Sequence, residues 1–113
     1  MTTQQIQERL REIQGKLAAL GAIHPGSLSE QYNVCGNPGC RCKDAKQPRK
    51  HGPYWQLSYT WRGKSTTRFV RPVRLVRLRR KIENYRRFRE LTAEWVDLAI
   101  ALERLEREAA KEA

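Results

Sequence analysis

Three cysteines lie within eight consecutive residues of this chain, and they restrict its fold more than any other feature of the sequence. The run GNPG separates Cys35 from Cys40, and these turn-forming residues let the backbone fold back so that both thiols face one centre. Cys42 follows after a single residue and brings a third sulfur near the same point. Because sulfur ligands at such spacing are typical of zinc sites, the pattern predicts a zinc knuckle over residues 33–52.

A tetrahedral zinc site needs a fourth ligand, and the chain has two histidines. The sequence favours His51, which follows a polar loop and precedes a turn at Gly52 and Pro53; His24, before Pro25, is the alternative. Four protein ligands leave no position for a reacting water, so the expected cofactor is a structural Zn²⁺. A disulfide and three unrelated thiols stay open as alternatives, although an odd number of cysteines does not favour a disulfide framework.

Apolar residues recur every three or four positions near both ends of the chain, which is the spacing of one helical face. Residues 4–20 form the first such segment. Residues 73–110 contain neither proline nor glycine and predict one long helix, unless it breaks near Asn84. The simplest arrangement packs residues 4–20 antiparallel against residues 91–109. Self-association through this coiled-coil-like region is an equally open alternative.

Residues 54–70 predict a β-hairpin whose first strand alternates between apolar or aromatic and polar residues. Arg62 and Gly63 form a two-residue turn in this prediction, whereas a three-residue turn would shift the register and send Phe69 inward. The two-residue turn places Trp61, Tyr59, Leu57 and Trp55 opposite Lys64, Thr66, Arg68 and Val70, respectively. This face either packs under the long helix, as a marginal two-stranded ribbon requires, or stacks on nucleic-acid bases. We favour packing.

Together these elements predict an α+β, mainly α fold in a single domain, residues 1–113, with residues 22–34 as a connector. A domain this small gains stability from a metal. No apolar run approaches the ~20 residues that span a bilayer, and the first residues are polar and helix-patterned, unlike an export signal. A cytoplasmic protein without a membrane partner is therefore expected.

The net charge of +11 is concentrated in the middle of the chain. Residues 35–90 hold 17 Lys and Arg against three Asp and Glu, whereas the flanking segments are neutral or acidic. Such a block attracts polyanions, of which nucleic acid is the commonest, and we expect its charge to gather at one end of the molecule. The residues expected to contact nucleic acid are Arg41, Lys43, Lys46, Arg49, Lys50, Arg62, Lys64, Arg68, Arg74, Arg77, Arg79, Arg80, Lys81, Arg86 and Arg87.

Four segments also point to a known family: GSLSEQYNVCGNPGCRC at 26–42, HGPYW at 51–55, LSYTWRGKSTTRFV at 57–70 and NYRRFREL at 84–91. They resemble a family of small prokaryotic proteins of unknown function that are often found beside transposases and other mobile elements. The resemblance implies a context of mobile DNA, and therefore DNA in preference to RNA as the partner.

Two classes of function follow. In the first, the chain is a small zinc-stabilised nucleic-acid-binding protein, an accessory or regulator of a transposon. In the second, it is a helical adaptor with a structural zinc that joins a co-encoded protein through its long helix. An enzyme is not expected, because Asp44, Glu83 and Glu90 are too scattered to hold catalytic metal ions, and the chain has no Ser/His/Asp set or phosphate-binding glycine loop.

Overall fold

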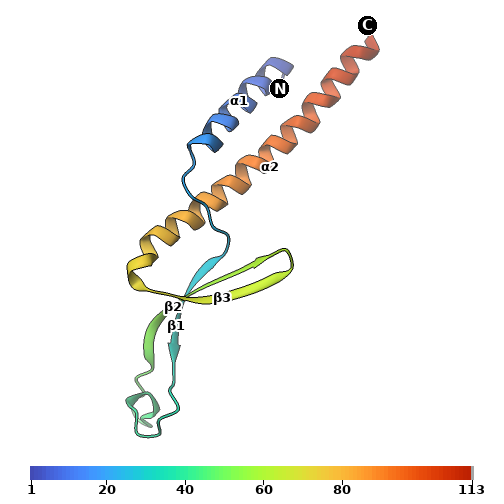
Figure 1. Ribbon diagram of the computed structural model, residues 1–113. Helices are drawn as coiled ribbons and strands as arrows, with labels where there is room; N and C mark the ends of the chain where they lie inside the picture. Colours follow the sequence, from blue (N-terminus) through green and yellow to red (C-terminus); the bar gives the residue numbers. More distant parts are fainter. Residues whose placement is uncertain (113) are drawn as a thin grey trace. The chain divides into compact units, whose positions relative to one another are not determined.

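The computed structural model describes residues 1–112 and shows an α+β fold, as predicted (Figure 1). The elements are α1 (Thr3–Ala19), β1 (Ser27–Asn33), the 3₁₀ turn η1 (Arg41–Lys43), β2 (His51–Trp61), β3 (Lys64–Val70), the 3₁₀ turn η2 (Pro72–Arg74) and α2 (Leu75–Glu112). Among the described residues, no helix combines the length and the apolar character needed to cross a membrane.

The chain divides into two compact units, which are described separately below. The helical unit consists of residues 1–24 and those from 83 onward, and the sheet unit consists of residues 25–82.

A capping box starts α1 in the helical unit. The Thr2 hydroxyl accepts a hydrogen bond from the Gln5 backbone N–H at 3.1 Å, and the Gln5 side chain accepts one from the Thr2 N–H at 2.9 Å. These bonds satisfy two N–H groups that a helix start otherwise leaves unpaired. The two helices lie side by side (Figure 1), as the apolar periodicity predicted.

The core of the helical unit lies between α1 and α2. Ile6 and Ile13 of α1 are fully buried against Leu91 and Leu98 of α2. Partly buried residues extend this core: Leu10, Leu17, Leu20, Ala101, Leu102 and Leu105.

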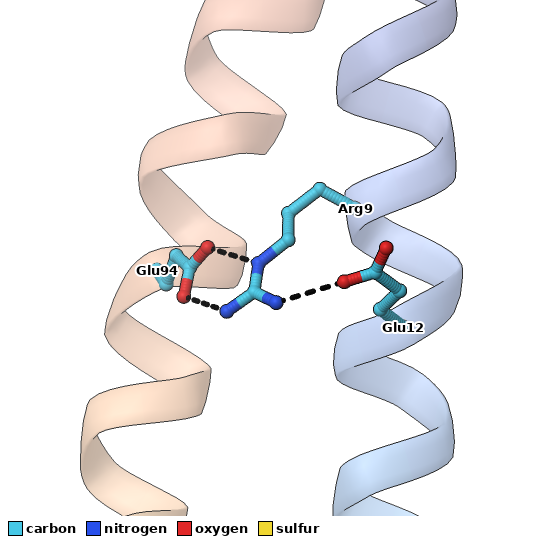
Figure 2. Close-up of polar contacts among 3 residues, drawn as sticks. All are labelled: Arg9, Glu12 and Glu94. Carbon is cyan, nitrogen blue, oxygen red and sulfur yellow. Dashed lines mark hydrogen bonds and ion pairs between the residues drawn. The ribbon is translucent and has the colours of Figure 1, made fainter.

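Two polar contacts show that α1 and α2 run antiparallel. The Arg9 guanidinium binds both carboxylate oxygens of Glu94, at 2.6 and 2.8 Å, and also Glu12 at 2.9 Å (Figure 2). Near the other end of the pair, the Asn84 side-chain amide donates to the Ala22 carbonyl at 3.0 Å. The break considered near Asn84 is absent, because α2 continues through this residue.

The sheet unit is built on three antiparallel strands in the order β1-β2-β3. The predicted hairpin is present as β2 and β3, and Trp61 pairs with Lys64 across a two-residue turn. Arg62 has φ +51° and Gly63 has φ +79°, the two positive values that a type I′ hairpin turn requires. The predicted register is therefore confirmed, with Trp55 opposite Val70.

The third strand, β1, corrects the prediction that residues 22–34 are only a connector. It pairs with the other edge of β2, placing Leu28 opposite Leu57 and Asn33 opposite His51. The segment SLSEQYN has no β-branched residue, so its own sequence favours a strand only weakly. The open edge of β2 provides the hydrogen-bonding partner that the local sequence does not reveal.

Candidate metal centre

The four predicted metal ligands lie together where the β1–β2 pair ends, and they are called the ligand group below. Cys35 follows β1, His51 is the first residue of β2, and the pairing of Asn33 with His51 sets the distance between these two arms. The register shifts between Gln31 and Asn33, and such a bulge redirects the strand that contains it.

Hydrogen bonds within the knuckle loop, residues 34–50, place the other two cysteines. The Asn37 side-chain oxygen accepts from the Gly39 N–H at 3.1 Å, and the Asn37 carbonyl accepts from the Cys40 N–H at 3.2 Å. The Cys40 carbonyl then accepts from Lys43 at 3.0 Å, within the turn that contains Cys42. The GNPG run thus folds back, as its turn-forming residues predicted.

The distances within the ligand group fit a metal ion. The Cys35 and Cys42 sulfurs are 3.5 Å apart, the Cys40 sulfur lies 3.0 Å from His51 Nε2, and all four ligand atoms lie within 4.8 Å of one another. In a tetrahedral zinc site with Zn–S near 2.3 Å and Zn–N near 2.0 Å, ligand atoms lie about 3.5 to 3.8 Å apart. Small adjustments therefore bring the four atoms around one ion.

The electrostatic environment differs between the thiols. The pKa of Cys40 is lowered to about 6, because the Cys42 backbone N–H donates to its sulfur and the Cys35, Cys42 and His51 side chains add further hydrogen bonds. Burial raises the pKa of Cys42, whose sulfur accepts a hydrogen bond from the Cys35 N–H at 3.3 Å. A cation bound between them would stabilise both sulfurs as thiolates.

The arrangement bears on both alternatives drawn from the sequence. All three cysteines are free thiols, so the structure contains no disulfide within the ligand group. His51 belongs to the group and His24 does not. With three sulfurs and one imidazole, the group can hold a metal ion in a closed tetrahedral site.

The basic residues predicted to contact nucleic acid are mostly exposed, but several have local partners. Within the sheet unit, the Arg79 guanidinium lies over the Trp55 ring, 4.8 Å from its centroid, so this side chain also covers an aromatic face. Within the helical unit, Arg86 and Arg87 form ion pairs one helical turn away, with Glu83 at 3.3 Å and Glu90 at 3.9 Å.

The basic residues of the sheet unit lie near both ends of β2. The knuckle loop, which contains Lys43 and Arg49, adjoins the first residue of β2, whereas Arg62 and Lys64 follow its last residue. β2 has 11 residues, so at about 3.3 Å per residue its ends lie up to about 33 Å apart. The charge is spread along the sheet.

Sequence reasoning did not identify Tyr54 and Phe69 as functional candidates. They lie on the sheet face opposite Trp55 and Leu57, and both are exposed. Strand alternation assigns residues to two faces, but it does not show which face other parts of the chain cover.

Comparison with known proteins places the ligand group inside a recognised domain. A family model described as a domain of unknown function (DUF6788) matches residues 3–80, a stretch that includes α1, the ligand group and all three strands. Neither the search of curated proteins nor the search of solved structures found a match.

Proposed function

This chain belongs to the DUF6788 family of unknown function, and we propose that it is a small zinc-stabilised nucleic-acid-binding protein whose partner is DNA. The observation that supports the proposal best is the Cys₃His ligand group next to a loop rich in exposed lysines and arginines. The segments that resemble proteins found beside transposases support an accessory or regulatory role in a mobile element.

Zinc is the metal that suits this ligand set best. Three thiolates and an imidazole favour a soft or borderline cation over Mg²⁺ or Ca²⁺, which prefer oxygen ligands. Four protein ligands leave no open position, so the proposed role is structural rather than catalytic. Bound zinc would hold the knuckle loop against the sheet and fix the positions of the basic residues on it, including Lys43 and Arg49.

Nucleic acid is the proposed partner because of the density of positive charge. The knuckle loop adds Arg41, Lys43, Lys46, Arg49 and Lys50 to the charge of β3 and the first turns of α2, and all five are exposed. The Arg49 N–H donates to the Arg41 carbonyl at 2.9 Å, which holds the two ends of this basic segment together. Exposed cations of this kind neutralise phosphates, and the resulting affinity falls steeply as salt rises.

The metal assignment is tested with matched histidine variants. Purified protein should contain about one zinc per chain, His51→Ala should lose most of it, and His24→Ala should retain it. Cys40→Ser should also lose the metal and unfold the knuckle loop. Metal analysis of the four proteins checks this prediction. Equal zinc content in both histidine variants would contradict the assignment of His51.

The nucleic-acid assignment is tested by balanced charge removal. Replacing Arg77 and Arg80 with alanine should weaken DNA binding and reduce the dependence of affinity on salt, because both residues are exposed in the sheet unit. Arg11 and Lys111 serve as controls, since replacing them with alanine removes the same charge from exposed positions of the helical unit. Arg79 is unsuitable because it also covers Trp55. Equal effects of the two double variants, or no binding at low salt, would refute the proposal.

A second candidate function, self-association through the long helix, has its own observation. Val96 and Ile100 are each 57% exposed, and they line a shallow hollow on α2 with Ala99, Glu103, Arg104 and Arg107. A stripe with both charge signs can pair with its own copy in an antiparallel dimer. Ile100→Glu should then convert a concentration-dependent dimer into a monomer in sedimentation experiments. A parent protein that is monomeric at every concentration measured would exclude self-association.

A further inference from the structure

Two aromatic side chains of the sheet unit, Tyr54 and Phe69, are exposed where a folded chain normally buries such rings. They are called the aromatic pair below. Their ring centroids are 6.3 Å apart in an edge-to-face arrangement, and the residues are 40% and 72% exposed. A contiguous apolar surface left open on a small domain often marks a binding site.

The surroundings of the aromatic pair show that it is not part of a core. The buried residue of the sheet, Leu57, lies on the opposite face, together with Trp55 under the Arg79 side chain. The face that bears the aromatic pair is otherwise polar. It contains Ser27, Ser29, Gln31, Gln56, Ser58, Thr60, Ser65 and Thr67. On this face of the sheet the two rings therefore lie among hydrogen-bonding side chains.

A hollow opens on each side of the aromatic pair, and both rings line both hollows. The larger hollow, about 480 Å³, is also lined by Pro53, Trp55, Val70, Arg71 and Pro72. The smaller one, about 270 Å³, reaches Cys35 and His51 of the ligand group. Flat ligands can thus reach the rings through either hollow. Arg71 lies beside the larger hollow, and Cys35, at the start of the knuckle loop, lies beside the smaller one.

We propose that the aromatic pair is a stacking platform for the bases of single-stranded DNA, an inference that rests on the proposed nucleic-acid function. Stacking suits this surface because every base presents a flat π-face, while Arg71 and the knuckle loop hold the phosphates between bases. The bases of a duplex are already stacked on one another and are not available to Phe69. The charge favours a polyanion over an apolar peptide as the occupant.

Abasic oligonucleotides separate stacking from charge, because they keep the phosphates and lack the bases. The full-length, zinc-loaded protein is titrated with oligodeoxythymidylate of roughly 12 nucleotides, within the usual site size of such proteins, and with its abasic counterpart. We expect the parent to prefer the base-containing strand, and Phe69→Leu to weaken that binding by about 5- to 150-fold. Binding to the abasic strand and to duplex DNA should change less than about twofold in Phe69→Leu, since phosphate contacts remain.

Two further variants show whether the ring itself matters. Unlike Phe69→Leu, Phe69→Trp should keep the preference for the base-containing strand over the abasic strand, because it replaces one flat ring with a larger one. Trp61→Leu should keep the preference, because Trp61 lies at the far end of β2 with Arg62 over its ring, 5.9 Å from the centroid. Phe69→Leu retains a β-compatible apolar residue at an exposed position, so the sheet should fold.

The outcomes distinguish this inference from the function on which it rests. Equal, salt-dependent binding of the base-containing and abasic strands would overturn the stacking platform and leave nucleic-acid binding intact. Tighter binding of oligouridylate than of oligodeoxythymidylate would show that RNA, not DNA, is the occupant. An absence of binding to any nucleic acid at low salt would refute both proposals.

Discussion

A single glycine controls how closely β1 and β2 approach beside the ligand group. Gly52 follows the ligand His51 and has φ +138°. A Cβ atom placed there would lie 2.7 Å from the Gln31 carbonyl oxygen and 3.1 Å from the Tyr32 ring. Both the backbone conformation and the lack of space therefore require glycine.

We expect Gly52→Ala to destabilise the sheet unit by roughly 1–3 kcal/mol and to weaken zinc binding, because the strand that holds His51 must move. Gly15→Ala is the matched control. Gly15 lies in the middle of α1, and a methyl group at this position would have nothing within 4 Å, so alanine there should add about 0.5–1 kcal/mol of stability. Urea unfolding and zinc titration of both variants provide the measurements, and unchanged zinc affinity in Gly52→Ala would contradict this account of His51.

At the same scale, the ligand group was predictable from sequence and the aromatic pair was not. The spacing of Cys35, Cys40 and Cys42 is a local property, and the turn residues between them limit the conformations that the loop can adopt. The exposure of Phe69 depends instead on which sheet face is covered. Residues distant in sequence determine which face is covered; for example, Arg79 lies over the Trp55 ring on the opposite face.

Among the secondary-structure elements, those with strong periodicity were predictable. α1 and α2 have apolar stripes that a helix alone explains, and the core of Ile6, Ile13, Leu91 and Leu98 follows from them. β1 has no comparable pattern, because most of its residues are polar and it forms by pairing with an available edge of β2. Its role in setting Cys35 near His51 was therefore visible only in the structure.

The contact between Arg9 and Glu94 makes the packing of α1 on α2 depend on pH. Hydrogen bonds from Arg9 lower the pKa of Glu94 below its usual value, so the folded state favours the carboxylate more than the unfolded state does. The ion pair therefore contributes to the free energy of unfolding. This contribution is fully present above the pKa of an unfolded glutamate, ~4.3, and is lost as the pH falls through the lower pKa of Glu94 in the folded state.

We therefore compare melting temperatures at neutral pH and at a pH below the pKa of an unfolded glutamate. Acidification should lower the melting temperature of the helical unit more in the parent than in Glu94→Gln. The glutamine can still accept a hydrogen bond from Arg9 but does not titrate. Glu108→Gln, an exposed glutamate of α2, should behave like the parent. Melting curves recorded by circular dichroism over this pH range provide the comparison. Parallel curves for parent and Glu94→Gln would show that the ion pair does not contribute.

For the whole molecule, the two units differ in what stabilises them. The helical unit buries four aliphatic side chains between its helices, whereas within residues 25–82 the buried residues are Cys42 and Leu57. Three strands with one buried leucine gain little from burial, at about 1.5–3 kcal/mol for such a side chain. Metal binding can provide the missing stability, because a ligand group that is absent from the unfolded chain couples binding to folding.

This difference predicts an uneven response to metal removal. We expect a chelator to abolish protection from hydrogen exchange in the knuckle loop and at its junctions with β1 and β2, while the segments that pack Ile6 and Ile13 against Leu91 and Leu98 keep theirs. Hydrogen exchange followed by mass spectrometry resolves these segments within one full-length protein, and restored zinc should reverse the change.

Two variants define the range of this experiment. Cys42→Ser without chelator should resemble the metal-free parent, because it removes a buried ligand. Ile13→Ala should reverse the pattern: a cavity between the helices, costing roughly 2–5 kcal/mol, should expose α1 while zinc still protects the knuckle loop. Loss of protection throughout the chain on chelation would mean that the units fold as one, so that the metal stabilises the helices as well. Unchanged protection everywhere would mean that the ligand group holds its shape without an ion and that zinc has no structural role.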